Sequence, residues 1–351
     1  MKRKKGYQKY TILPTTGCNA RCVYCFEEGR KQVAMSRDLT EKTISFILSS
    51  HRDGKLVYIE WFGGGPLLAT EQIDRISHAL QERHIEVIGG MVSNGSLVTD
   101  RIIKKMKTAW NIRSIQISMD GTEEQYIRRK QYYRYENEYR HVLENIARLV
   151  ANGIFVNIRV NVDEGNVEDI PAFIQDLDEA FPDKTNISVY FVPLKEVRNS
   201  EACWKIWQPC LQAKEKLEEV GFILQEEDLV LSPKVNYCIA DDTTANVVIS
   251  SDGSLYNCED CTPGFSFGNV EDGITDAERL HWYEEHGATR EKCRHCIFLP
   301  ECTSFSRCPM VDRHCQKVRN EIQKRVMRQI IAKKAKDQEI DEESLSISRT
   351  C

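Results

Sequence analysis

The chain has 351 residues, of which 41% are hydrophobic and 29% charged, and its formal net charge is −5 at pH 7. This length and apolar content suffice for one large domain and a smaller one, and the modest, mixed charge argues against a nucleic-acid surface. No run approaches the roughly 18 apolar residues that a membrane span needs. The basic stretch Met1–Lys5 precedes no apolar signal segment, so we expect a cytoplasmic protein without a membrane partner.

Strand-like apolar runs alternate with helix-like segments along the first 200 residues. The predicted strands are Tyr10–Pro14, Leu56–Phe62, Ile85–Val92, Ile112–Met119, Ile154–Val162 and Ile187–Pro193. The predicted helices between them are Thr40–Ser50, Glu71–Arg83, Asp100–Ala109, Tyr139–Asn152 and Val167–Ala180. This alternation is typical of βα units, and it predicts an α/β domain with a parallel sheet over residues 8–200.

Beyond residue 200 the pattern changes. We expect a bridging region over residues 201–237, with a helix at Cys203–Gly221. A turn-rich, cysteine-dense domain follows over residues 238–318, and a polar helical tail over residues 319–351. Because the cysteine-dense domain has little apolar sequence, we expect bound metal to organise it.

The 14 cysteines fall mainly into two groups. Three lie within residues 18–25, and eight lie between Cys238 and Cys315, whereas Cys203, Cys210 and Cys351 fit no motif. In a reducing compartment, cysteines grouped in this way favour metal or cluster ligation over disulfides.

Residues suited to chemistry follow each of the first four predicted strands, where parallel sheets place their active sites. These segments are Cys18–Cys25, Gly63–Pro66, Ser93–Gly95 and Ser118–Gly121. Thiolates bind either zinc or iron–sulfur clusters. Three cysteines on a four-iron cluster leave one iron open, whereas structural zinc needs a fourth ligand, and no histidine precedes His51.

The spacing Cys18-x3-Cys22-x2-Cys25, with Tyr24 before the last cysteine, resembles the signature of radical S-adenosylmethionine (radical SAM) enzymes. The resemblance covers the whole predicted α/β region and implies a partial (β/α)6 radical SAM barrel. It also implies a [4Fe–4S] cluster whose open iron is chelated by S-adenosylmethionine. Reductive cleavage of that cofactor yields methionine and a 5′-deoxyadenosyl radical.

The same resemblance implies cofactor contacts at the other strand ends. Gly63-Gly64-Gly65-Pro66 is similar to the family's Gly-Gly-Glu-Pro turn, with Gly65 where Glu is usual. The residues that match the family's cofactor-contacting segments are Ser93 and Asn94 near the ribose, Ser118 and Asp120 in a Ser-Leu-Asp-Gly-like segment, and Arg129 opposite the cofactor's carboxylate. Each of these assignments has an alternative. The glycines could form a plain βα turn that binds no cofactor, and Arg129 could lie on a solvated basic face.

The carboxy-terminal cysteines resemble the SPASM extension of radical enzymes that modify peptides and proteins, which holds two auxiliary [4Fe–4S] clusters. By this resemblance the outer cluster is held by Cys293, Cys296, Cys302 and Cys315, and the inner one by Cys238, Cys258 and Cys308. Five residues separate Cys302 from Cys308, where three are usual, and an upstream cysteine of relatives is missing. The inner cluster then either recruits Cys261 or keeps an open iron.

Glu259 takes the place of an aspartate thought to accept a proton in sulfatase-maturing relatives, so it is the candidate catalytic residue. A simple surface acid is the alternative. The leading interpretation is a peptide maturase of the RiPP class (ribosomally made, then modified peptides), which abstracts hydrogen on the way to a cross-link, thioether or epimer. It would carry three [4Fe–4S] clusters and S-adenosylmethionine.

The expected partners are a peptide or protein substrate and a flavodoxin or ferredoxin as electron donor. Because the cysteine loop begins at residue 18, we expect leader recognition to need either a separate leader-recognition protein or the catalytic surface itself. Two other functions stay open at this point. One is an anaerobic sulfatase maturase that makes formylglycine, and the other is a zinc-organised, non-catalytic binding module.

Overall fold

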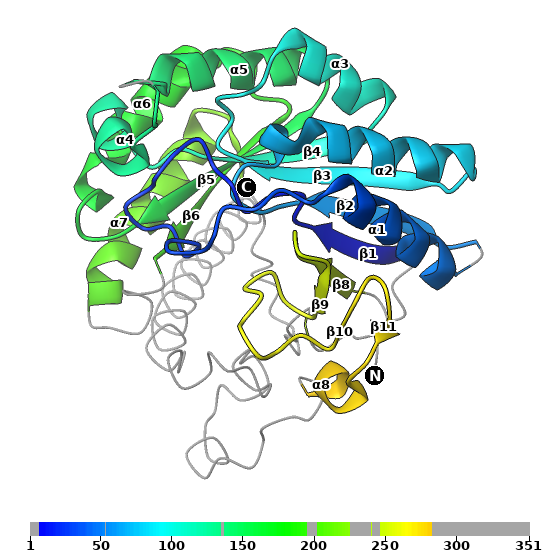
Figure 1. The fold of residues 1–351 in the computed structure, drawn as a ribbon. Coiled ribbons are helices and arrows are strands. Elements are labelled where there is room, and N and C mark those ends of the chain that lie inside the picture. The colour runs from blue at the N-terminus through cyan, green and yellow to red at the C-terminus, as the bar shows by residue number, and fades with distance from the viewer. Residues whose placement is uncertain are drawn as a thin grey trace, which may run out of the picture.

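The computed structural model describes residues 7–52, 54–134, 137–194, 202–224, 240 and 246–282 (Figure 1). Six strands follow the predicted apolar runs: β1 (Tyr7–Ile12), β2 (Leu56–Trp61), β3 (Val87–Ser93), β4 (Ile112–Ser118), β5 (Phe155–Val162) and β6 (Ile187–Pro193). They pair in parallel and in chain order, and a short β7 (Ile223–Leu224) adds to β6. The predicted α/β fold with a parallel sheet is confirmed.

Helices connect the strands and form an arc along one side of the sheet (Figure 1). The predicted ones are α1 (Arg37–Ser50), α2 (Thr70–Glu82), α3 (Asp100–Thr108), α5 (Tyr139–Ala151), α6 (Ile170–Ala180) and the bridging α7 (Ala202–Glu219). Two 3-10 turns, η1 (Pro66–Ala69) and η2 (Val167–Asp169), precede α2 and α6. The sequence did not predict α4 (Glu123–Lys130).

Side-chain caps fix where two of these helices begin. The Ser36 hydroxyl accepts a hydrogen bond from the Leu39 amide at 3.1 Å at the start of α1. The Thr99 hydroxyl accepts one from the Ile102 amide at 3.3 Å at the start of α3. Each cap satisfies an amide that has no partner within the first helical turn.

The strands alternate between an apolar and a polar face. On β2, Val57, Ile59 and Trp61 are buried in the shared core beneath the helices. Successive side chains of a strand point to opposite faces, so Tyr58 and Glu60 lie on the other face. That second face is largely polar and carries Lys9, Glu60, Gln116, Asn157, Arg159 and Tyr190. The parallel sheet thus has one face packed in the core and one available for polar ligands.

The described part of the cysteine-dense region extends the same sheet. The strand β8 (Asn246–Ile249) pairs in parallel with β1, and β9 (Ser254–Tyr256), β10 (Gly268–Asn269) and β11 (Gly273–Ile274) follow antiparallel, before the short helix α8 (Ala277–His281). Leu255, Phe267 and Val270 are buried in the common core. Sheet pairing therefore organises the described part of this segment, and organisation by bound metal stays a prediction. The domain boundaries at residues 200, 238 and 319 stay predictions.

In the part of the chain that the structure describes, no helix is long and apolar enough to cross a lipid bilayer.

A buried asparagine ties together the carboxyl ends of β4 and β5. The Asn166 side chain is 1% exposed. Its Nδ2 donates to the carbonyl oxygens of Asp120 at 2.7 Å and Asn161 at 2.9 Å. Its Oδ1 accepts from the Asp163 amide at 2.9 Å. Three backbone groups, two of them in buried hydrogen bonds, thus depend on one side chain.

We expect Asn166→Ala to lower the free energy of unfolding by about 1–3 kcal/mol, because it leaves buried backbone groups unpaired. Urea unfolding followed by circular dichroism measures the change. Asn152→Ala, at an exposed position after α5, is the matched control and should stay within about 0.5 kcal/mol of the parent. Equal effects of the two substitutions would contradict the assignment.

Candidate functional site

The three amino-terminal cysteines lie on the loop after β1, at the carboxyl edge of the sheet. Cys18, Cys22 and Cys25 are partly exposed, and none forms a disulfide. The base of the loop is closed by its own backbone: the Thr16 amide donates to the Val33 carbonyl, and the Met35 amide to the Pro14 carbonyl, both at 2.9 Å. The loop is thus held as one unit at the strand end.

The outer part of this loop docks on the end of α4. The Arg21 amide donates to the Gln131 carbonyl at 2.9 Å, and the Val23 amide to the Arg129 carbonyl at 3.0 Å. Gln131 ends the helix in the left-handed conformation, with φ at 42°. This geometry exposes the last carbonyls of α4 to the cysteine loop instead of to a further helical turn.

Two of the three thiols, those of Cys18 and Cys25, are in an environment that favours the neutral form until a metal binds. Burial raises the pKa values of Cys18 and Cys25, and the neighbouring cysteines raise them further. Ligation of iron or zinc requires thiolates, so metal binding must displace these protons. In the part of the chain that the structure describes, no three Cys, His, Asp or Glu side chains converge on a single metal ion. Three thiols on one loop can each bind a different iron of a four-iron cluster.

The glycine turn after β2 packs directly against the start of the cysteine loop. A Cβ on Gly64 would lie 2.5 Å from the Thr16 carbonyl oxygen and 2.6 Å from that of Gly17. Gly63 has φ at 106°, and a Cβ there would lie 2.4 Å from the Thr15 carbonyl oxygen. At Gly65 the nearest atom would be 3.6 Å away, an ordinary contact. Two of the three glycines are thus required by backbone packing, and Gly65 is not.

The segment after β3 contacts the first cysteine. The Asn94 Nδ2 atom lies 3.9 Å from the Cys18 sulfur and donates to the Asn19 side chain at 2.8 Å. Asn19 in turn donates to the Ser96 hydroxyl at 2.9 Å. The Ser93 hydroxyl accepts from the Gly95 amide at 3.1 Å and stays within its own turn. The structure therefore brings Asn94, but not the Ser93 side chain, against the cysteine loop.

Tyr24, Ser118 and Asp120 come together around a fourth residue, Lys130. The Lys130 ammonium donates to the Tyr24 hydroxyl at 2.7 Å and to the Ser118 hydroxyl at 2.5 Å, and lies 3.4 Å from the Asp120 carboxylate. The Tyr24 hydroxyl donates to Asp120. The Asn161 amide and side chain hold the other carboxylate oxygen at 2.9 and 3.0 Å. We call Tyr24, Ser118, Asp120 and Lys130 the buried network.

Arg129 is also buried, and it forms an ion pair inside the protein. One guanidinium nitrogen, Nη1, lies 3.0 and 2.8 Å from the two oxygens of Asp163. The guanidinium also lies over the Tyr24 ring, 5.1 Å from its centroid. Nε and Nη2 are buried without a hydrogen-bond partner. A solvated basic face is therefore excluded for Arg129, and the two unpaired donors fit a ligand carboxylate.

Two carboxy-terminal cysteines approach the amino-terminal loop. Cys258 and Cys261 form a turn in which the Cys261 amide donates to the Cys258 carbonyl at 3.1 Å. The Arg30 side chain, from the end of the cysteine loop, donates to the Asp260 carbonyl within this turn. Burial raises the pKa of Cys261 to about 12, although Arg30 opposes the shift. The Cys258–Cys261 turn thus contacts the end of the amino-terminal cysteine loop.

Glu259, the predicted catalytic acid, is exposed on the same turn. The other predicted auxiliary ligands, Cys238, Cys293, Cys296, Cys302, Cys308 and Cys315, lie outside the described residues. Their ligand roles, and a proton-accepting role for Glu259, stay predictions.

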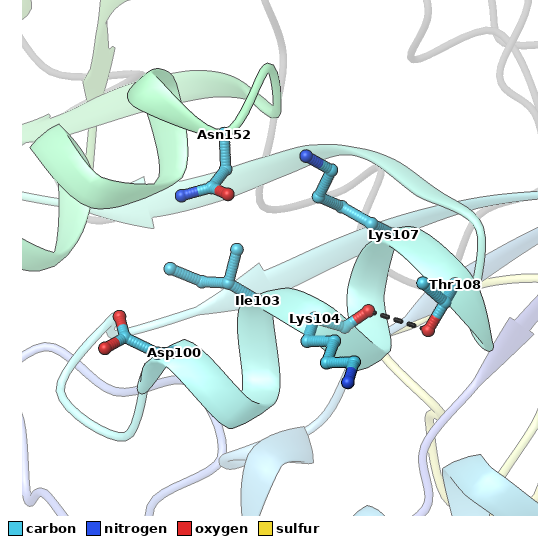
Figure 2. A pocket seen from close by; sticks show the side chains of 6 residues that line it. All are labelled: Asp100, Ile103, Lys104, Lys107, Thr108 and Asn152. Carbon is cyan, nitrogen blue, oxygen red and sulfur yellow. Dashed lines mark hydrogen bonds between the residues drawn. The ribbon is translucent and has the colours of Figure 1, made fainter.

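A pocket on the outer helical layer is separate from this site. Figure 2 shows that it is lined by residues of α3 and by the residue that follows α5. Its lining consists of Asp100, Ile103, Lys104, Lys107, Thr108 and Asn152. It holds no cysteine and none of the predicted cofactor contacts, so we do not place the reaction there.

No motif in the sequence singles out Lys130 or Asn19. Lys130 ends the basic run Arg128-Arg129-Lys130, which by itself is typical of a solvated helix face. One feature could have pointed to Lys130. Because α4 directly follows the Ser118–Gly121 segment, the end of α4 lies beside the carboxyl edge of the sheet.

Comparison with known proteins identifies the fold of this region. A family model described as "Radical SAM superfamily" matches residues 12–177. The Fe-coproporphyrin III synthase of Methanosarcina barkeri is 23% identical over 165 residues, which are 47% of this chain and 39% of that protein. The chain spans about two fifths of the length of the curated relatives it matches.

Solved structures extend the likeness over most of the chain. The protein anSMEcpe with bound AdoMet and Cp18Cys peptide is 17% identical with a TM-score of 0.65, over 86% of this chain and 89% of that one. SuiB of Streptococcus suis bound to precursor peptide SuiA is 14% identical with a TM-score of 0.61, over 85% and 71%. At these identities the likeness shows a shared fold.

The glycine turn yields a matched pair of substitutions. We expect Gly64→Ala to lower the melting temperature and the iron bound after anaerobic reconstitution, because its Cβ would collide with two backbone carbonyls. Gly65→Ala, one residue along, should leave both unchanged. Calorimetry and iron analysis of the two variants check this, and loss of iron in Gly65→Ala alone would contradict the packing.

Proposed function

We propose that this protein is a radical SAM enzyme that modifies a peptide. The proposal proceeds from the match of residues 12–177 to the radical SAM superfamily. One observation carries the proposal. Three thiols on one loop lie at the carboxyl edge of a parallel sheet, against the Gly63–Gly65 turn and Asn94. Ligands of parallel α/β sheets bind at this edge.

The cysteine loop has the donor set for a [4Fe–4S] cluster with one open iron. When bound, the cluster and S-adenosylmethionine supply an electron and a 5′-deoxyadenosyl radical. Cys18, Cys22 and Cys25 would hold three of the irons. The Gly63–Gly65 turn allows close backbone approach, and the unpaired Nε and Nη2 of Arg129 would receive the cofactor's carboxylate. In this arrangement the protein orients the cofactor between the loop and the strand ends.

The polar face of the sheet is where a peptide would meet the radical. It presents the Lys9–Glu60 ion pair and the Tyr190 hydroxyl, which donates to Gln116 at 2.5 Å. Polar groups of this kind suit the hydrogen-bonding groups of a peptide better than a purely apolar substrate. Two solved structures with this fold, anSMEcpe and SuiB, were determined with peptides bound, which supports a peptide substrate here. The product would be a cross-link, a thioether or an epimer.

The remaining parts of the proposal concern the carboxy-terminal cysteines and the partners. Two auxiliary [4Fe–4S] clusters would be held by Cys258, with Cys261 or an open iron, and by the cysteines outside the described residues. A flavodoxin or ferredoxin would supply electrons, and either a separate protein or the catalytic surface itself would recognise the substrate's leader. Free thiols and oxygen-sensitive clusters suit a reducing cytoplasm.

Iron and sulfide content distinguishes the enzyme from a zinc-organised module. Anaerobically prepared protein should bind roughly 12 iron atoms per chain, the number in three four-iron clusters. Cys18→Ala should lose about four of them and all formation of 5′-deoxyadenosine under dithionite. Cys210→Ala, a buried cysteine of α7, is the matched control and should keep both. Zinc without sulfide in the parent protein would contradict the radical chemistry.

A further inference from the structure

The cysteine loop and the segment that ends α4 form a short antiparallel ribbon at the edge of the molecule (Figure 1). Ala20 and Tyr132 form an isolated bridge between the two segments. One step further along, the Tyr133 amide donates to the Asn19 carbonyl at 3.1 Å. Successive side chains of an extended segment point to opposite sides. Because Ala20 is buried, its neighbours along the ribbon lie on the solvent side.

The solvent side of this ribbon carries large exposed side chains. Val23 is 55% exposed and Tyr133 is 60% exposed. The Arg21 side chain is 67% exposed, and Gln131, whose carbonyl accepts from the Arg21 amide, is also exposed. We call Arg21, Val23, Gln131 and Tyr133 the ribbon face. Exposed apolar groups that lie close together mark interaction sites, and aromatic and arginine side chains are enriched in protein interfaces.

The ribbon face is positively charged. Besides Arg21, the exposed residues Arg128 and Arg134 lie beside it in the chain. The carboxylate of Glu28 lies 3.6 Å from Arg21, but a long ion pair between two exposed side chains holds them together only weakly. The exposed Glu124 is at the opposite end of α4. Since the whole chain has a formal net charge of −5, this positive face stands out from its average charge.

The ribbon face is also next to the thiols. Arg21 and Val23 flank Cys22 directly in the chain. A protein bound to this face is therefore within one residue of a thiol that the proposed cluster uses. Because the rate of electron transfer falls steeply with distance, the face suits the entry of an electron. The proposed peptide site, with the Lys9–Glu60 ion pair, is on the polar face of the sheet instead.

We propose that the ribbon face is the docking surface of an acidic electron-transfer protein, of the flavodoxin or ferredoxin class, that reduces the cluster held by Cys18, Cys22 and Cys25. The inference rests on the proposed function, since it concerns how an electron reaches that cluster. One electron passes from the reduced donor to the oxidised cluster, and the donor leaves with one electron fewer. Opposite charges speed the encounter of two proteins, and electron-transfer partners typically bind weakly through small interfaces.

The test compares two reductants of the same full-length holoprotein, with 5′-deoxyadenosine formation in the absence of peptide as the readout. Dithionite is a small molecule that needs no docking surface, whereas a reduced flavodoxin of strongly negative net charge must bind. In Arg21→Glu/Arg134→Glu the flavodoxin-driven rate should fall by about tenfold or more at low salt. The dithionite-driven rate should stay near that of the parent, because the loop is held through backbone amides, which any residue supplies.

Two control variants and a salt series accompany this comparison. Arg21→Lys/Arg134→Lys keeps the charge and should keep most of the flavodoxin-driven rate. Lys104→Glu/Lys107→Glu makes the same change of charge on α3, beside Asn152, which precedes β5 and so lies at the opposite edge of the sheet. It should leave both rates unchanged. The flavodoxin-driven rate of the parent should fall between about 0.05 and 0.5 M sodium chloride, because salt screens exposed charges.

An unchanged flavodoxin-driven rate in Arg21→Glu/Arg134→Glu, or an equal loss in the α3 variant, would overturn the inference. An equal loss with dithionite would also overturn it, because the face would then serve the cofactor and not a donor. The same holds for a parent that reacts with dithionite but with neither a reduced flavodoxin nor a reduced ferredoxin.

Iron and sulfide per chain are measured on every sample. If the double variant loses iron, Arg134→Glu alone, which lies outside the cysteine loop, gives the same comparison and should also slow only the flavodoxin-driven reaction. A parent that forms no 5′-deoxyadenosine with dithionite would contradict the proposed function instead, so the two failures are distinguishable.

Discussion

The loop that carries Cys18, Cys22 and Cys25 forms turns but no helix or strand, and it is held in shape from two sides. On one side Gly63 and Gly64 pack so closely against the Thr15–Gly17 backbone that a methyl group on either does not fit. On the other side the end of α4 offers its carbonyls to the loop amides, and the buried network ties Tyr24 to β4. The positions of the three thiols follow from these two contacts, which both depend on the alignment of the parallel strand ends.

Much of this arrangement follows from the sequence because parallel strands are buried on at least one face and read as apolar runs. Once the runs are found, their carboxyl ends must meet at one edge, so the cysteine loop, the glycine turn and Asn94 are predictable neighbours. The motif spacing then predicts the chemistry. This reasoning needs no knowledge of side-chain contacts.

What the sequence did not predict depends on contacts between distant segments. The helix α4 is short and polar, and its lysine is buried only because Asp120 and Tyr24 arrive from a strand end and a loop. The strands β8–β11 are two to four residues long, too short for a periodic signal, and the parallel pairing of β8 with β1 stabilises them. The Arg129–Asp163 ion pair likewise joins residues 34 positions apart. A pairing of this kind leaves no local pattern.

The central claim is that the three-cysteine loop leaves one iron open and that S-adenosylmethionine binds there. The most direct test is electron–nuclear double resonance of the reduced holoprotein with cofactor labelled with ¹⁷O at its carboxylate. The account predicts a hyperfine coupling that shows the carboxylate bound to iron, and predicts its loss in Cys22→Ala. A reduced four-iron signal in the parent that shows no coupling to the labelled cofactor would contradict it.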